Sequence, residues 1–325
     1  MFLPAYPLHV VFILDNRCNL ACTHCSSAAS TAGAKGFDTA GAMRVVDQLA
    51  AAGIIDIAFS GGEPLLRHDL EKLIEHALAR GLTVGTSTNG YALTEQRAKA
   101  LKATGLNRLQ ISLDGTPAVH DAIRGAGSFV RAYTAIGRAK QAGLRTHVCF
   151  TAMRSNAADL PSVIELVVAA GADGFNLSQF VPTGRGARDQ DIDPATSRQL
   201  LETWLRAKVQ HPHMYFAAHS TGLIDVDPAA GLCSGGCQAG IGIGCIGAGG
   251  EVMPCVMFPL VLGNLHEKSF QEIWGTHPLL ERLRQREIGG SCGACPHRVA
   301  CAGCRAAAWA HTGDPLAADP RCWHH

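Results

Sequence analysis

Short apolar runs alternate with longer amphipathic stretches from residue 9 to about residue 180. The apolar runs have the length of strands, and the stretches between them repeat their apolar positions at the spacing of a helical face. We expect strands at residues 9–14, 54–60, 82–87, 108–113, 145–151 and 174–179. We expect helices near residues 39–52, 69–80, 94–103, 129–142 and 157–170, each followed by a glycine of the kind that ends helices.

Repeated strand–helix units predict a parallel sheet covered by helices. Six units are fewer than the eight that close a full barrel, so we predict an α/β fold with an open, partial (β/α)6 barrel of the TIM type. In such folds ligands bind at the carboxyl ends of the strands. Motifs that directly follow a predicted strand are therefore the candidates for chemistry.

The rest of the chain has a different character. Residues 183–232 carry Gly, Asp and Pro interruptions around one helical stretch at 194–210, and we interpret them as a bridge. Residues 233–325 are rich in Cys and Gly with little periodicity, so we expect bound metal to organise them. We divide the chain into a partial barrel at 1–182, a bridging segment at 183–232 and a metal-organised domain at 233–325.

Composition narrows the classes of function. The formal net charge is +1 and no block of Lys or Arg is present, which gives no electrostatic footprint for nucleic acid or an anionic membrane. No run of 18 apolar residues occurs, and the start of the chain lacks the features of a signal peptide. We expect a cytoplasmic protein with neither nucleic acid nor membrane as a partner.

Thirteen cysteines, an odd number without a secretory signal, argue against a disulfide framework. Three lie near the start of the chain, nine fall between Cys233 and Cys322, and Cys149 stands alone. Clustered reduced cysteines are typical of metal ligands, so the distribution predicts two metal-bearing regions. Cys149 lies inside a predicted strand, and we interpret it as a small core residue.

Cys18, Cys22 and Cys25 follow the first predicted strand with the spacing C-x3-C-x2-C. Three thiolates on one loop can hold three irons of a 4Fe–4S cluster and leave the fourth iron open. The alternative is a structural zinc site, which needs four ligands. Its obvious fourth ligand is His24, which is adjacent to Cys25, so simultaneous coordination by both would be strained.

Three further motifs follow predicted strands. They are Gly61-Gly62-Glu63-Pro64, the segment that contains Ser87 and Asn89, and the segment that contains Ser112 and Asp114. Taken together with the cysteine loop, these motifs resemble the radical S-adenosylmethionine (radical SAM) superfamily. The resemblance implies that the open iron chelates the methionyl group of S-adenosylmethionine, that the GGEP turn meets the methionyl amine, and that the other two segments line the cofactor and substrate pocket.

Two of these motifs also fit an ordinary structural role. Read alone, the GGEP sequence is also an ordinary strand-to-helix turn. His120, Asp121, Arg124 and Gly125 resemble an HDxxRG stretch of related proteins, but they also fit a solvated helix start with Arg124 as a cap or surface charge. We assign no catalytic residue from them.

The C-terminal cysteines form pairs with metal-ligand spacing. Cys292 and Cys295 make one C-x2-C pair, Cys301 and Cys304 make another, and seventeen residues separate Cys304 from Cys322. A zinc ribbon is the alternative. With the Gly-x4-Cys spacing that ends at Cys255, the segment resembles the SPASM extension of radical SAM proteins, which implies two auxiliary 4Fe–4S clusters.

The resemblance also implies a partition of ligands. The outer cluster would take Cys292, Cys295, Cys301 and Cys322. The inner cluster would take Cys237, Cys255 and Cys304 with either Cys233 or Cys245, of which we favour Cys233. Three clusters with one open iron need eleven thiolates, so one cysteine besides Cys149 is surplus. The x2 spacing between Cys301 and Cys304, where the family has x3, leaves the partition of these two open.

If the resemblance holds, a reduced cluster passes an electron to S-adenosylmethionine, and the resulting 5′-deoxyadenosyl radical abstracts hydrogen from the substrate. Auxiliary clusters suit an oxidative outcome, because they can accept the electron that the substrate radical loses. We therefore expect a radical SAM oxidoreductase that modifies a peptide or protein, as maturases of ribosomally made peptides do by crosslinking or oxidation.

Two other functions remain open from the sequence. One is tailoring of tetrapyrrole side chains in an alternative haem or haem d1 pathway, for which Arg185 and Arg188 are candidate partners of a propionate. The distant one is a zinc-organised binding module without activity. The expected partners are a peptide or small-molecule substrate and an electron donor such as flavodoxin or ferredoxin. Because only eight residues precede the first strand, a leader peptide would need a separate binding protein or the bridge.

Overall fold

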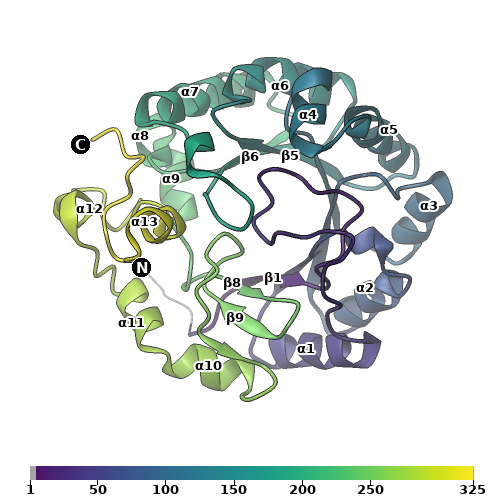
Figure 1. The fold of residues 1–325 in the computed structure, drawn as a ribbon, viewed down its shortest axis with the longest axis horizontal. Helices are drawn as coiled ribbons and strands as arrows, with labels where there is room; N and C mark the ends of the chain where they lie inside the picture. Colours follow the sequence, from purple (N-terminus) through teal and green to yellow (C-terminus); the bar gives the residue numbers. More distant parts are fainter. Residues whose placement is uncertain (1–4, 325) are drawn as a thin grey trace.

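The computed structural model describes residues 5–324, except for the side chains of residues 232–234. Its centre is a sheet whose parallel strands follow the order β8-β1-β2-β3-β4-β5-β6-β7. Figure 1 shows these strands as a ring with helices around the outside. The strands at the centre of this order are β1 His9–Ile13, β2 Asp56–Ser60, β3 Thr83–Thr88, β4 Arg108–Ser112, β5 Thr146–Ala152 and β6 Gly174–Gln179. All six predicted strands are confirmed.

Helices connect consecutive strands and cover the outside of the ring. They are α1 Thr39–Ala51, α2 Leu70–Ala79, α3 Glu95–Ala103, α4 Pro117–Arg124, α5 Ser128–Gln141 and α6 Leu160–Ala169. Single 3₁₀ turns occur at Pro64–Leu66, Ala157–Asp159 and Arg188–Gln190. The five predicted helices are confirmed, and α4 is an additional helix over the stretch that contains His120 and Arg124.

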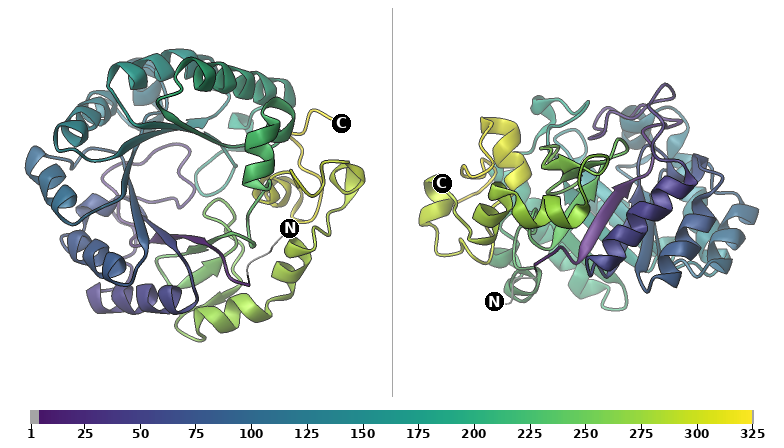
Figure 2. Two further views of the ribbon diagram at one scale, coloured as in Figure 1. Left: turned by 180° about the vertical axis from the view of Figure 1, so that it is seen from behind. Right: turned by 90° about the horizontal axis from the view of Figure 1, so that it is seen from below.

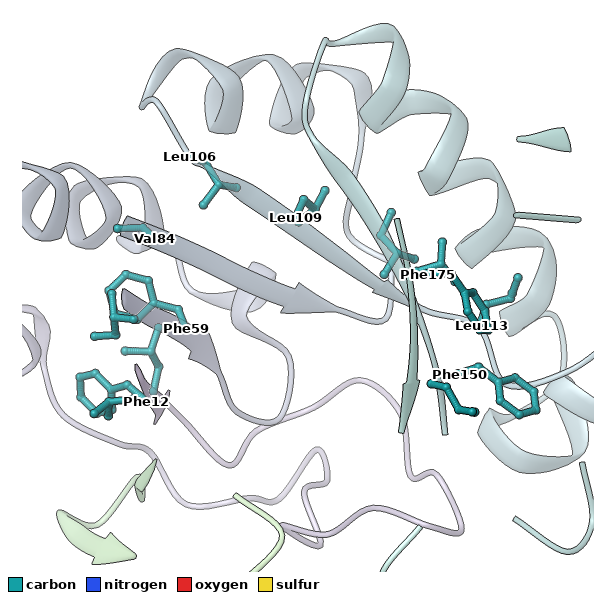
Figure 3. Close-up of a cluster of buried hydrophobic side chains, with 14 of the residues drawn as sticks. Phe12, Phe59, Val84, Leu106, Leu109, Leu113, Phe150 and Phe175 are labelled. Carbon is teal, nitrogen blue, oxygen red and sulfur yellow. The ribbon is translucent and has the colours of Figure 1, made fainter. Parts of the chain in front are cut away.

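Alternate strand residues point outward and form the hydrophobic core between the sheet and the helices. Phe12, Phe59, Phe150 and Phe175 are fully buried there. Figure 3 shows their side chains and those of neighbouring residues on the side of the strands that faces the helices. Because strand side chains alternate between faces, the residues between these positions face the interior of the ring.

The two edges of the parallel sheet come from the segments beyond the six units. Helix α7, Pro194–Gln210, leads to β7, Tyr215–His219, which pairs with β6. Strand β8, Ile243–Ile246, pairs in parallel with β1. The partial (β/α)6 barrel is therefore confirmed and gains one strand at each edge. Strands β9 Glu251–Met253 and β10 Gly263–Asn264 continue the sheet in antiparallel fashion beyond β8.

The remaining helices lie at one side of the ring, where the C-terminal third of the chain gathers (Figures 1 and 2). They are α8 Leu223–Val226, α9 Pro228–Ser234, α10 Phe270–Thr276, α11 Pro278–Arg284, α12 Gly290–Ala294 and α13 Arg305–Thr312. Trp274 of α10 is fully buried against Gly244 of β8. No helix among the described residues is long and apolar enough to cross a lipid bilayer.

Candidate active site

The loop between β1 and α1 carries the first three cysteines and lies over the middle of the ring (Figure 1). Cys18 and Cys22 are buried, and Cys25 is partly exposed. The Cys18 amide donates to Ser30 O at 2.9 Å, which folds the loop back on itself. Burial raises the pKa of the Cys18 thiol to about 11 and also raises that of Cys22. The thiols of Cys18 and Cys22 would therefore be protonated at neutral pH, and binding of a metal would release their protons.

The GGEP turn after β2 packs directly against this loop. The Gly62 amide donates to Asp15 O at 2.6 Å, and the Glu63 amide donates to Arg17 O at 3.0 Å. A Cβ atom at Gly62 would lie 2.1 Å from Arg17 O and 3.0 Å from the Cys18 nitrogen. Only glycine therefore allows the turn to approach the cysteine loop this closely.

The Glu63 carboxylate links the GGEP turn to the end of β3. It is almost fully buried and accepts hydrogen bonds from Thr88 Oγ1 at 2.7 Å, the Asn89 amide at 2.8 Å and the Leu65 amide at 3.0 Å. Burial raises the pKa of this carboxyl, and the three hydrogen bonds oppose the rise. In this structure the side chain of Glu63 positions β3. Contact of Glu63 with a methionyl amine stays a prediction.

Two of the predicted pocket residues at the end of β3 differ in their contacts. Asn89 Nδ2 donates to Asn19 Oδ1 at 3.0 Å and lies 3.8 Å from Cys18 Sγ, so this amide reaches the cysteine loop. Ser87 faces the interior of the ring, where its hydroxyl accepts from Gln110 Nε2 at 3.3 Å. Asn89 therefore belongs to the cysteine site, and Ser87 belongs to the interior wall.

The segment after β4 places the buried Asp114 carboxylate and its partner Arg124 beside Cys22. Asp114 Oδ2 accepts from Arg124 Nε at 2.5 Å and lies 3.3 Å from His24 Nε2, while Asp114 Oδ1 accepts from the Thr151 amide at 2.8 Å. Arg124 Nη1 lies 3.9 Å from Cys22 Sγ. Arg124 is therefore a largely buried partner of the cysteine loop, with only 11% of its side chain exposed, and its interpretation as a surface charge is wrong.

Two histidines near Asp114 are neutral by virtue of burial. Burial lowers the pKa of His24 to about 4 and that of His120 to about 4, although Asp114 raises both. The Asp114 amide donates to His120 Nδ1 at 3.0 Å, which ties the start of α4 to the end of β4. The predicted Ser112 ends β4 on its interior face, next to Cys149 of β5 in the strand register.

Cys149 faces the interior of the barrel. Its strand neighbours Val148 and Phe150 are in the core between sheet and helices, whereas Cys149 is partly exposed and lies in none of the hydrophobic clusters of the described residues. Burial raises the pKa of its thiol to about 12, and the charges of Asp114 and Arg124 act on it. The interpretation of Cys149 as a core residue is therefore wrong, because the strand alternation turns it inward.

The segment after β6 closes over the cysteine loop. The Arg185 amide donates to Cys25 O at 3.0 Å, and Arg185 Nε donates to Cys22 O at 3.0 Å. A Cβ atom at Gly184 would lie 2.4 Å from Cys25 O, so glycine is required where the two segments meet. Arg185 Nη2 is buried with no hydrogen-bond partner among the described residues. Arg188, in contrast, is exposed and donates to Ala310 O at 2.8 Å.

Four C-terminal cysteines meet in one place. A cavity among the described residues is lined by Cys292, Cys295, Cys301 and Cys322, the four residues predicted for the outer site. Backbone amides donate toward two of the sulfurs, from Asp319 to Cys292 Sγ at 3.4 Å and from His297 to Cys295 Sγ at 3.4 Å. Such N–H donors favour thiolates, so this donor set fits an iron–sulfur cluster.

The cysteines of the predicted inner site form a second group. Cys237, Cys255 and Cys304 pack against the same hydrophobic cluster around Phe258, and burial raises the pKa of Cys255 to about 12. Cys245 is fully buried in a different cluster. The side chain of Cys233 lies outside the described residues. The choice between Cys233 and Cys245 therefore stays a prediction.

No three His, Cys, Asp or Glu side chains among the described residues converge closely enough to hold a single metal ion. A 4Fe–4S cluster makes a different demand, since each thiolate binds its own iron at a separate corner. The cysteine loop and the cavity with four cysteines supply thiols in that looser arrangement.

Comparison with known proteins defines the family. A model described as the radical SAM superfamily matches residues 12–167, and a SPASM model described as an iron-sulfur cluster-binding domain matches residues 237–296. The chain belongs to the radical SAM superfamily. It is a radical SAM enzyme with a SPASM domain, and it depends on S-adenosylmethionine and 4Fe–4S chemistry.

The relatives of this radical SAM protein carry more than one activity in their names. The chain is 33% identical to the AdoMet-dependent heme synthase of Methanosarcina barkeri, over 97% of this chain and 96% of the relative. It is 34% identical to the mycofactocin maturase MftC of Mycobacterium tuberculosis H37Rv, over 97% of this chain and 83% of the relative. The family is therefore established. The two relatives have different named activities but nearly equal identity to this chain, so these identities do not distinguish between their substrate classes.

Solved structures agree on the fold. SuiB of Streptococcus suis bound to S-adenosylmethionine superposes with a TM-score of 0.81 at 18% identity, covering 98% of this chain and 78% of that one. The protein anSMEcpe with bound AdoMet gives a TM-score of 0.76 at 18% identity, covering 97% of this chain and 94% of that one.

The sequence analysis did not predict the contacts that three residues make in this radical SAM site. The sequence suggests His24 only as a zinc ligand and Arg185 only as a partner of a substrate propionate. Arg124 was left open between two interpretations, although the HDxxRG stretch was a usable signal. For Arg185 the sequence offers no signal, because its contacts with the cysteine loop bridge a long separation along the chain.

Proposed function

We propose that the chain cleaves S-adenosylmethionine at a cluster held by Cys18, Cys22 and Cys25 and uses the product to modify a peptide oxidatively. When bound, the cluster and S-adenosylmethionine supply a 5′-deoxyadenosyl radical that can abstract hydrogen from an unactivated carbon. The observation that carries the proposal is the cysteine loop packed on the GGEP turn at the carboxyl ends of β1 and β2.

Within this proposal the residues around the loop have defined tasks. Gly61, Gly62, Glu63, Pro64, Ser87, Asn89, Ser112 and Asp114 form the cofactor pocket. The close fit between Gly62 and the loop supports this, since it brings backbone groups to the cysteines. Arg124 places a positive charge beside Cys22, and Asp114 holds that charge in position.

We extend the proposal to two auxiliary 4Fe–4S clusters, which makes three in all. The outer one would use Cys292, Cys295, Cys301 and Cys322, and the inner one Cys237, Cys255 and Cys304 with Cys233. The shared cavity of the outer cysteines and the common packing of the inner ones support this partition. Clusters with four protein ligands have no open iron, which suits electron transfer.

The interior wall of the barrel favours a peptide. Asn176 Nδ2 donates to Gln110 Oε1 at 2.6 Å, and Gln110 in turn donates to Ser87, so amides and a hydroxyl span β3, β4 and β6. Asn176 Oδ1 is buried and has no partner among the described residues. Amide groups of this kind match the donors and acceptors of a peptide backbone.

A tetrapyrrole is the second candidate substrate, favoured by the relatives named AdoMet-dependent heme synthase and by Arg185. Arg185 Nη2 lacks a partner among the described residues, so it could receive a propionate. Arg124 and Arg108 are less suited, because they already face Asp114 and Asp56.

The proposal includes a cytoplasmic location, an electron donor such as flavodoxin or ferredoxin, and a separate protein that binds the leader of the peptide. A reduced compartment is consistent with the many free cysteines. The proposed chemistry needs one electron for each cleavage of S-adenosylmethionine, which a small redox protein can deliver.

Iron and sulfide analysis of anaerobically reconstituted protein, with electron paramagnetic resonance (EPR), tests the proposal. We expect about twelve irons and one cluster signal that changes when S-adenosylmethionine is added. The triple replacement of Cys18, Cys22 and Cys25 by Ala should keep about eight irons and lose cleavage of S-adenosylmethionine. Cys149→Ala is the matched control and should keep all irons. Retained cleavage in the triple variant would refute the assignment of the first cluster.

Substrate class is tested with the reconstituted enzyme and two probes. We expect hydrogen transfer from a candidate precursor peptide encoded beside the gene, seen as modified peptide by mass spectrometry. Loss of carboxylate from an added porphyrin, without change of the peptide, would favour the tetrapyrrole instead.

A further inference from the structure

A buried ion pair lies where the C-terminal segment meets the end of β6. Asp319 is fully buried and Arg321 is 3% exposed. Arg321 Nη1 donates to Phe180 O at 2.9 Å, directly after β6. The pair therefore lies between the barrel and the cysteine-rich domain, and neither side chain takes part in the function proposed above.

Asp319 contacts residues from both predicted auxiliary sites. Its Oδ2 atom accepts from the Cys304 amide at 2.5 Å and from the Thr221 hydroxyl. Its own backbone amide donates to Cys292 Sγ at 3.4 Å. A single residue thus holds a ligand expected at the inner cluster and a ligand expected at the outer one.

Arg321 is held by this carboxylate. Asp319 Oδ1 accepts from the Arg321 amide at 3.0 Å and from Arg321 Nε at 3.4 Å. The other oxygen of the same carboxylate accepts from the Cys304 amide, so only the Asp319 carboxylate lies between the Arg321 guanidinium and the Cys304 backbone. Arg321 is thereby linked through Asp319 to Cys304, a predicted inner ligand, and it directly precedes Cys322, a predicted outer ligand.

A buried positive charge has a definite effect on a nearby cluster. Reduction adds one negative charge to the cluster, and a cation in a region of low dielectric stabilises that added charge. The reduction potential of the cluster rises as a result. A cluster with a higher potential is the better acceptor of an electron from an oxidising substrate.

We propose that Arg321 raises the reduction potential of the inner auxiliary cluster and that Asp319 is the positioning residue that holds Arg321 and Cys304 together. The inference rests on the auxiliary clusters of the proposed function. In the proposed oxidation the substrate radical would lose one electron and release a proton to water, and a cluster held by Cys237, Cys255 and Cys304 would supply the acceptor for that electron.

The test uses the full-length triple variant that lacks Cys18, Cys22 and Cys25, so that only auxiliary clusters contribute signals. Arg321→Gln removes the charge and keeps hydrogen-bond donors, whereas Arg321→Lys keeps the charge. Arg282→Met is the matched control, because Arg282 lies in the same domain, pairs with Glu287 and is 56% exposed. Each variant is analysed for iron and titrated with reductant while EPR is recorded.

We expect about eight irons in all these proteins. In Arg321→Gln, one of the two midpoint potentials should shift to a more negative value while the other changes less. Arg321→Lys and Arg282→Met should retain the parental potentials. Unchanged potentials in Arg321→Gln with eight irons bound would overturn the inference.

Iron content separates the possible failures. If the triple variant itself binds far fewer than eight irons, the auxiliary clusters of the proposed function are wrong. If the triple variant binds eight irons but both Arg321→Gln and a second neutral variant, Arg321→Met, lose one cluster, Arg321 is needed to build the site. That result would also overturn its role in setting the potential.

Discussion

Gly62 shows how one missing side chain shapes the candidate active site. A Cβ atom there would collide with backbone atoms of Arg17, which precedes the first cysteine, and backbone cannot rotate away as a side chain does. We expect Gly62→Ala to displace the cysteine loop and to lower the iron content by about four per chain, with the irons of the C-terminal domain retained. Iron analysis and EPR with S-adenosylmethionine measure both effects.

Gly137→Ala is the control for this substitution. Gly137 lies within α5, and a Cβ atom there would meet nothing within 4 Å. We expect unchanged iron content and a free energy of unfolding higher by about 0.5–1 kcal/mol, because Ala is the better helix former. Equal iron loss in both variants would show that the collision at Gly62 is not the cause.

His147 makes the stability of the barrel depend on pH. It is 3% exposed, stacks on Tyr215, and has no hydrogen-bond partner on either ring nitrogen among the described residues. Burial lowers its pKa to about 4. As the pH falls below about 6.5, the unfolded chain binds a proton that the folded chain resists, so stability is lost between about pH 6.5 and pH 4, by at most about 3 kcal/mol.

His147→Phe should remove this contribution. Phenylalanine keeps the ring that stacks on Tyr215 and loses no hydrogen bond. We expect the thermal midpoint of the variant to fall less than that of the parent between pH 7.5 and pH 5. Parallel decreases in the two proteins would assign the pH dependence to other groups, such as His24 and His120.

Individual residues were predictable where the sequence places chemistry at a strand end. The cysteine loop and the GGEP turn are of this kind, because position after a strand fixes their place at the mouth of the barrel. Arg185 was not predictable in its observed role. Its partners Cys22 and Cys25 come from the other end of the barrel sequence, and only the folded ring brings them together.

At the scale of elements, the segment after β6 acts as a clamp on the cysteine loop. Arg185 Nε bonds Cys22 O, and a charge-assisted bond of this type contributes about 1.5–3 kcal/mol. Arg185→Gln should therefore lower the fraction of molecules in which the cysteine loop has its observed conformation, by about tenfold or more. We expect cleavage of S-adenosylmethionine to slow accordingly while iron content stays the same.

Arg188→Gln provides the comparison within the same segment. Arg188 is exposed and bonds Ala310 O, with no bond to the cysteine loop among the described contacts. Its replacement should leave cleavage close to that of the parent. An equal loss of rate in both variants would point to a general loosening of the segment, and iron loss in Arg185→Gln alone would make the clamp necessary for cluster assembly.

The predictability of the elements follows their length and pattern. The six central strands have short apolar runs that alternate regularly with helices, and their positions were predicted correctly. Strand β7 reads Tyr-Phe-Ala-Ala-His and buries Phe216 alone, while β8 has four residues with Gly at its second position. The hydrophobic pattern of either segment also fits a loop, so the sequence did not predict these two edge strands.

At the scale of the molecule, the C-terminal third completes the barrel. Strand β8 lies within residues 233–325, which the sequence analysis assigned to a separate metal-organised domain, yet it pairs with β1 of the barrel. Ile246, Phe270, Ile273 and Trp274 all belong to the main hydrophobic core. The sequence could not reveal this, because the cysteine-rich composition suggested a domain held by metal alone.

The division of the chain near residue 230 can be tested by ending it at residue 232. The shortened chain would lack β8 and would expose the core residues that Trp274 and its neighbours cover. Four large apolar side chains contribute about 1.5–3 kcal/mol each, a sum that rivals the whole stability of an ordinary domain. We therefore expect residues 1–232 to aggregate and to bind little iron.

A full-length chain with Cys292 and Cys295 replaced by Ala separates the loss of packing from the loss of metal. It keeps β8 and α10 but lacks two ligands of the predicted outer cluster. We expect it to retain the first cluster and the EPR change with S-adenosylmethionine. If residues 1–232 were instead soluble, with about four irons and that same EPR change, the barrel would fold without β8. The pairing of β8 with β1 would then be dispensable for the first cluster, and the boundary near residue 230 would mark an independent domain.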